Sequence, residues 1–248
     1  MDVLYIMWLR QVKRYWRSRA RMIGAIGQPL LFLVALGFGF GPIYQKAGGG
    51  NYIDFLAPGI IAMSILFTAM FGGIDVIWDR QFGFLKETLV APVSRIKIMI
   101  GRTLGGATVA SFQGIIVLII SIIIGFRPAN LLHIPTTLAL MFLIALLFTG
   151  LGTAIASRLE DMQAFPLIMN FLIMPIFFIS GALFPLTGLP EAISLVARFN
   201  PLSYGVDGLR QVLTGVIHLG LMLDFGVLIG SVLIVGAIGS YLFSKIEI

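Results

Sequence analysis

Residues 134–157 read IPTTLALMFLIALLFTGLGTAIAS, a run of 24 residues that contains no charged side chain. An α-helix rises about 1.5 Å per residue, so a helix of this length crosses the roughly 30 Å hydrocarbon core of a bilayer. The run therefore predicts a membrane-spanning helix and points to the class of integral membrane proteins.

Stretches of the same kind recur along the chain. Four more runs of 20 or more residues are uncharged: 22–45, 103–126, 162–190 and 225–244. A further run, 55–78, qualifies if Asp75 is accepted near its end. Residues 211–223 are also uncharged, but 13 residues are too few for a span and fit a re-entrant or interfacial segment. We therefore expect one all-α membrane domain over residues 1–248 with six transmembrane helices.

The composition agrees with this class and excludes others. Hydrophobic residues make up 58% of the chain and charged residues 11%, against about 45–50% and 25% in soluble proteins. With no cysteine and two histidines, the chain has no disulfides or thiolate metal sites, and a metal enzyme is disfavoured. The net charge of +6 does not indicate a nucleic-acid partner, because no soluble basic domain exists to carry one.

The basic residues set the expected orientation. Of the 17 Lys and Arg residues, 13 fall in alternate segments between the spans, and the intervening loops hold Lys46, Arg127, Arg198 and Arg210. Lys and Arg accumulate in cytoplasmic loops, where anionic lipid head groups attract them. We expect a multi-pass protein of the plasma or inner membrane with both termini in the cytoplasm.

Residues 1–21 have the pattern of an amphipathic helix. At about 100° per residue, one face carries Arg10, Lys13, Arg14, Arg17 and Arg21, and the other carries Leu4, Tyr5, Trp8, Val12, Tyr15 and Trp16. Such a helix is expected to lie on the inner leaflet, with its aromatic side chains at the head-group boundary. Asp75 could pair with a basic residue of this helix or with Arg80.

The expected cytoplasmic loop 79–102 contains a second amphipathic segment, GFLKETLVAPVSR at 83–95. Leu85 and Leu89 are four residues apart with Phe84 and Val90 beside them, and Pro92 ends the pattern. The apolar patch could lie on the membrane or dock into a soluble partner, and the pattern alone leaves both open.

Polar residues inside the spans have two interpretations. They could line a transport pathway, or they could form hydrogen bonds between helices, which is the commoner role. We take as candidates for the pathway Gln28, Ser64, Thr68 and Asn170. The pairs Gly101 with Gly105 and Gly226 with Gly230 predict close helix packing.

Three segments together resemble the permease subunit of type-2 ABC exporters, the family of daunorubicin-type drug exporters and of polysaccharide and lipo-oligosaccharide export permeases. They are GFLKETLVAPVSRIKIMIGR at 83–102, PIFFISGALFPLTGLP at 175–190 and NPLSYGVDGLR at 200–210. With the basic start and QPLLFL at 28–33, the resemblance covers the whole chain.

The resemblance implies a division of labour between chains. A separate ATPase subunit binds ATP and Mg²⁺, so no cofactor is expected here, and this chain indeed lacks G-x-x-x-x-G-K-[ST]. The ATPase would dock on loop 79–102, through Phe84, Leu85, Leu89 and Val90, with Lys86 and Glu87 at the rim and Pro92 at the end. A smaller second contact would involve Arg158, Glu160 and Asp161.

The resemblance also implies an assembly and an outer gate. Two permeases would form a homodimer with their first and fifth helices at the seam. Residues 185–223 would form an external re-entrant pair between the fifth and sixth helices, and Asp207 and Arg210 would lie there either as a weak pair or as two solvated charges.

The function expected on this basis is export of an amphiphile, such as a drug, a lipid or a lipid-linked glycan, with no catalytic residue on this chain. A self-sufficient secondary transporter is the main alternative, although only the second half has a strongly proline-broken helix. An intramembrane enzyme is a weaker one, since His133 and His218 both fall in external regions.

Overall fold

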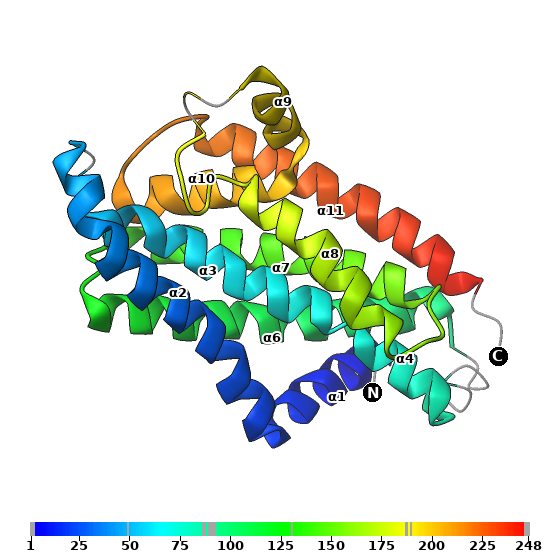
Figure 1. Cartoon of the computed structure of the whole chain (residues 1–248). Coiled ribbons are helices and arrows are strands. Elements are labelled where there is room, and N and C mark those ends of the chain that lie inside the picture. The colour runs from blue at the N-terminus through cyan, green and yellow to red at the C-terminus, as the bar shows by residue number, and fades with distance from the viewer. Residues whose placement is uncertain are drawn as a thin grey trace.

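The computed structural model describes residues 3–48, 50–85, 88, 93–129, 131–186, 188 and 190–245, and in these residues it is helical without a strand. The predicted all-α membrane fold is confirmed (Figure 1). The elements are α1 (Val3–Arg17), α2 (Arg19–Lys46), α3 (Tyr52–Phe71), α4 (Ile74–Gln81), α6 (Arg95–Ile124), η1 (Leu131–His133), α7 (Ile134–Ala156), α8 (Ala164–Phe178), α9 (Glu191–Phe199), α10 (Pro201–Thr214) and α11 (Leu221–Ser244).

Within the described residues, five stretches are long and apolar enough to cross a membrane: α2, α3 together with α4, α6, α7 and α11. The remaining expected span, 162–190, is the fifth along the chain. It is helical only as α8, over 15 residues or about 22 Å. The helix ends at Phe178 and turns follow it. In these turns Gly181 adopts a left-handed φ of +77°, which other residues rarely adopt. The structure therefore has five long apolar helices and a shorter one.

The centre of the bundle is formed by α3 and α7. Most of α3 is buried, including Leu56, Ile60 and Met63, and α7 contributes Ile144 and Phe148 to the same core. In Figure 1 these two helices run between α2 and α6 on one side and α8 and α11 on the other. A helix buried on all sides needs no polar face, which is why the sequences of both are almost uniformly apolar.

The first helix packs more closely on the bundle than expected. A Cβ atom at Gly101 would lie 2.7 Å from Cβ of Met7, so α1 lies directly on the glycine face of α6. Trp8 Nε1 donates to Thr108 Oγ1 at 3.0 Å, and the buried Tyr15 hydroxyl donates to Gln113 Oε1. Trp8 and Tyr15 of the aromatic face thus pack against α6, and the place of this face at the head-group boundary stays a prediction.

The two ends of the chain lie at the same end of the bundle. Arg10 of α1 pairs with Asp79 of α4, and Arg95 at the start of α6 donates to the Ser244 carbonyl at the end of α11. In Figure 1 the start of α1 and the end of α11 lie at the same end of the bundle as α4. We call this the α4 end, and the opposite one, where α9 and α10 lie, the α10 end.

Candidate functional site at the α4 end of the bundle

Two buried carboxylates at the α4 end gather guanidinium groups from three other helices. They stand four residues apart on α4 and therefore share one face of it. We call this group the arginine–aspartate cluster: Asp75 and Asp79 with Arg10 and Arg14 of α1, Arg21 of α2 and Arg102 of α6.

Asp79 is the more tightly held of the two acids. Its Oδ1 lies 2.8 Å from Nη2 of Arg10 and 3.5 Å from Nη1 of Arg14, and its Oδ2 pairs with Arg102. Asp79 and Arg102 are each about 3% exposed, so their charges compensate one another away from water. This pair fixes α4 against α6 and α1.

Asp75 is held more loosely, with Oδ1 3.5 Å from both Arg14 and Arg21. The expectation that Asp75 pairs with the basic N-terminal helix is confirmed, while its alternative partner Arg80 instead pairs with Glu160 at 3.8 Å. Four guanidinium groups and two carboxylates leave the cluster with excess positive charge. Burial, followed by repulsion from Arg14, lowers the pKa of Arg10 below its ordinary value.

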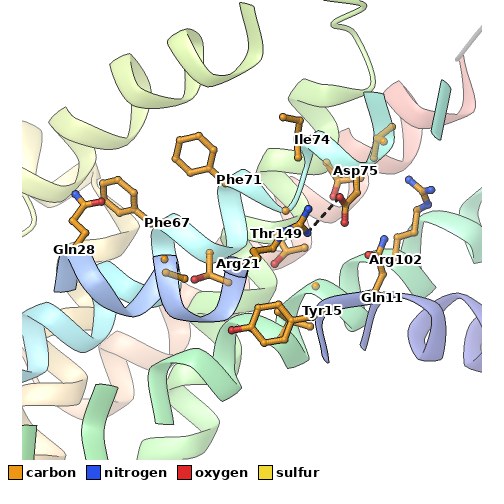
Figure 2. Close-up of a pocket in the computed structure, with 18 of the residues that line it drawn as sticks. Gln11, Tyr15, Arg21, Gln28, Phe67, Phe71, Ile74, Asp75, Arg102 and Thr149 are labelled. Atoms are coloured by element: carbon orange, nitrogen blue, oxygen red, sulfur yellow. Dashed lines mark ion pairs between the residues drawn. The ribbon is translucent and has the colours of Figure 1, made fainter. Parts of the chain in front are cut away.

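A cavity of about 330 Å³ adjoins the cluster, with walls from α1, α2, α3, α4, α6 and α7. In Figure 2, Arg21 reaches Asp75 at one end of the cavity, and Gln28 and Phe67 lie toward the other. Phe71 supplies further apolar wall, and polar groups come from several helices: Gln11, Tyr15, Thr68 and Thr149. The cavity is therefore amphipathic, with a charged end and an aromatic wall.

On the other side of the cluster lies an open groove of about 430 Å³. Its lining is basic and aromatic: Arg10, Lys13, Arg14 and Arg17 with Trp78, Phe82, Phe84 and a single acid, Asp79. The Arg14 guanidinium lies 5.5 Å from the Trp78 ring centre, and that of Arg10 lies 5.8 Å from Phe84. This surface is suited to an acidic partner with apolar side chains.

Comparison with known proteins gives the family. The family model of the ABC-2 type transporter matches residues 2–214. The chain belongs to the ABC-2 type transporter family. It is a multi-pass membrane protein and a permease of this class, as its relatives are.

Three relatives illustrate the similarity. A transport permease named ycf38 from Pyropia yezoensis is 32% identical over 213 residues, covering 84% of this chain and 72% of the relative. Nodulation protein J of Rhizobium leguminosarum bv. trifolii is 30% identical over 213 residues, covering 85% and 78%. The inner membrane transport permease YadH of Escherichia coli K12 is 26% identical over 226 residues, covering 90% and 87%.

Within this ABC-2 permease, the expected docking segment borders the groove. Phe84 is 52% exposed and lines the groove, whereas Leu85 is 2% exposed and packs inside the chain. Thr88 Oγ1 donates to the Phe84 carbonyl at 2.8 Å, one helical turn back. The remaining residues of the predicted docking face lie outside the described residues: Lys86, Glu87, Leu89, Val90 and Pro92.

The expected second contact lies at the same end. Arg158, Glu160 and Asp161 are all exposed in the turn between α7 and α8. Gln81 Nε2 at the end of α4 donates to the Glu160 carbonyl at 3.0 Å. The turn is therefore joined to α4 just before the docking segment begins, although its own contact with a partner stays a prediction.

The four candidate pathway residues are separated by the fold. Gln28 and Thr68 line the cavity, Ser64 is buried outside its lining, and Asn170 is exposed on the outer face of α8. Whether any of them contacts a substrate stays a prediction.

Sequence reasoning missed Asp79 and Arg102 because they stood at the two ends of a loop, 23 positions apart in the chain. The i, i+4 spacing of Asp75 and Asp79 was the available signal for a shared acidic face. Among the described residues, no three His, Asp or Glu side chains form a group that could hold a metal ion.

At the α10 end, the motif NPLSYGVDGLR connects helices. Arg210 Nη2 donates to the Gly181 carbonyl at 2.9 Å, and its guanidinium lies 4.1 Å from the Phe55 ring centre. Asp207 accepts from the Leu219 amide at 3.0 Å, and Asn200 donates to the Ile176 carbonyl at 2.7 Å.

Of the two alternatives for Asp207 and Arg210, the one with two solvated charges is wrong, and no ion pair within 4 Å joins the two side chains among the described residues. Arg210 and Asp207 are each 6% exposed, since backbone groups of neighbouring segments solvate them. The predicted re-entrant pair corresponds to the short helices α9 and α10, and its depth in a membrane stays a prediction.

Proposed function

We propose that this ABC-2 permease is the membrane subunit of an exporter driven by a separate ATPase, which docks at the α4 end. The observation that carries the proposal is that one charged cluster borders both the groove next to segment 83–95 and the cavity between the helices. A displacement of α4 by a docked partner would therefore alter the ion pairs at the cavity wall.

The groove supports the choice of docking surface. Four basic side chains and one acid line it, and Phe82 and Phe84 are 68% and 52% exposed. Exposed aromatic side chains beside unpaired charge are typical of protein interfaces. On this proposal the α4 end faces the cytoplasm, where ATP is available, and both termini lie there too.

The cavity supports an amphiphilic substrate. Its volume is at the lower end of the roughly 300–1,000 Å³ of small-molecule sites. Charged and amide groups stand at its ends and aromatic rings along its wall, so it can hold a polar head and part of an apolar chain. A drug, a lipid and a lipid-linked glycan all meet this description.

The test uses two variants of neighbouring residues, Phe84→Ser and Leu85→Ser. Phe84→Ser removes an exposed anchor, so co-purification of a co-expressed partner ATPase should fall about ten-fold while the chain stays folded. Leu85→Ser should lower the unfolding temperature as well, because the side chain is buried.

The readouts are co-purified ATPase, ATP-driven transport in proteoliposomes and thermal unfolding. Transport by the purified chain alone would replace the proposal with a self-sufficient secondary transporter. Wild-type ATPase retention by Phe84→Ser would remove the groove from the docking surface.

A further inference from the structure

The arginine–aspartate cluster has more positive charge than its own acids neutralise. Its members face two spaces: Arg21, Asp75 and Arg102 line the cavity, while Arg10, Arg14 and Asp79 line the groove. Lys13 and Arg17 add to the positive charge on the groove side. An anion entering from either side would meet excess positive charge.

The acid of the cluster that lines the cavity, Asp75, is held only by long ion pairs. The Asp75 carboxylate is 3.5 Å from both Arg14 and Arg21, whereas a charge-assisted hydrogen bond is about 2.7–2.9 Å long. Arg21 is 37% exposed and Arg14 28%, so neither guanidinium is fully desolvated by its acid. Both have N–H groups available to a further acceptor.

The rest of the cavity supplies the apolar half of a ligand site. Phe67, Phe71 and Met63 of α3 and Pro29 of α2 line it. Figure 2 shows the rings of Phe67 and Phe71 along one wall and Arg21 directed to the Asp75 end. A ligand that spans the cavity therefore has a charged end and an apolar end.

We propose that the cavity selects amphiphiles with an anionic head group, such as a phosphate or carboxylate, which pairs with Arg21 at the Asp75 end. The step in which such an amphiphile is exported rests on the proposed function, whereas its binding does not. The anionic group satisfies the loosely held guanidinium of Arg21, and the first part of its chain lies against Phe67 and Phe71.

The binding test uses purified protein in a neutral maltoside detergent with two probes of equal chain length, dioctanoyl phosphatidic acid and dioctanoyl phosphatidylcholine. The dissociation constants can be followed by the fluorescence of the tryptophans, of which Trp8 and Trp16 are on α1. Wild-type protein should bind the anionic probe about ten-fold or more tightly than the zwitterionic one.

Three variants of α2 test whether Arg21 causes the preference for the anionic probe. Arg21→Gln should bind both probes equally, and Arg21→Lys should recover most of the preference because it restores the charge. Arg19→Gln is the matched control, since Arg19 is exposed on the same helical turn and has no ion pair within 4 Å among the described residues. Equal binding of both probes by wild type, or an equal loss in Arg19→Gln, would overturn the proposal.

A second arm separates an exported amphiphile from a resident inner-leaflet phospholipid. In proteoliposomes with the ATPase, ATP-dependent movement of a fluorescent short-chain phosphatidic acid identifies an exported ligand. A resident phospholipid is identified if wild-type protein retains phospholipid through purification, Arg21→Gln loses it, and ATP moves no fluorescent probe. Either result supports the anionic site, while absence of any ATP-driven transport with intact probe binding refutes only the proposed function.

Discussion

Asp79 shows how much of the α4 end depends on single side chains. It is the acid that pairs with Arg102 and lies 2.8 Å from Arg10. Without it, a guanidinium that is 3% exposed would be left in the bundle with no carboxylate within 4 Å among the described residues. A buried charge that loses its partner is among the most destabilising changes known in proteins.

We expect Asp79→Asn to lower the free energy of unfolding by about 3–5 kcal/mol, the range for breaking a buried pair. Thermal unfolding in detergent measures this as a lower transition temperature. Asp161→Asn serves as the control, because Asp161 is an exposed carboxylate at the same end. An Asp79→Asn protein that unfolds at the wild-type temperature would show that Arg102 finds other partners.

The elements are held together by close backbone approach as well as by charge. On α6, a Cβ atom at Gly105 would lie 2.7 Å from Cβ of Gln11 and 3.0 Å from the Trp8 carbonyl oxygen, so α1 packs in van der Waals contact there. On α11, a Cβ atom added at Gly226 or Gly230 would meet no atom of another part of the described chain within 4 Å. The prediction of close packing is confirmed for the first pair and wrong, within this chain, for the second.

These two glycine motifs give a matched pair of substitutions. Gly105→Ala should push α1 away from α6, lengthen the Trp8–Thr108 hydrogen bond and destabilise the protein by about 1–3 kcal/mol. Gly226→Ala should be neutral or slightly stabilising, since Ala is the better helix former and meets open space. Tryptophan fluorescence and thermal unfolding distinguish the two, and equal behaviour would contradict the α1–α6 packing.

The whole molecule leaves large apolar side chains on its outside. Phe171 and Leu167 of α8 are 84% and 72% exposed, and Leu31 of α2 is 69% exposed. In a membrane such side chains face lipid or a second copy. The resemblance places the first and fifth apolar helices, α2 and α8, at a homodimer seam, which makes α8 the place to test assembly.

We expect a cysteine at Phe171 to crosslink two copies of the permease under mild oxidation. The chain has no cysteine of its own, so a single introduced thiol reports without background. A cysteine at Met222, which is 93% exposed on α11, is the control and should remain monomeric. Crosslinking at both positions would indicate random collision. If neither cysteine crosslinks, the dimer seam lies elsewhere.

The sequence alone determined the membrane class, one close helix contact and the class of transporter. Uncharged runs such as 134–157 determined the membrane class and marked where the long apolar helices lie, because the bilayer sets both their length and their polarity. The spacing of Gly101 and Gly105 determined a close helix contact, and the family motifs determined the class of transporter. Each of these is a local property, read within one segment.

The tertiary structure alone decided the site. Asp79 and Arg102 belong to different helices, and only the packing of α4 against α6 places them in one buried pair. The same packing buried Leu85 while leaving Phe84 exposed, and it buried Asp207 and Arg210, for which the sequence left open a weak pair or two solvated charges. A side chain's partner depends on which helices pack together in the folded chain. Helical periodicity within one segment does not predict this packing.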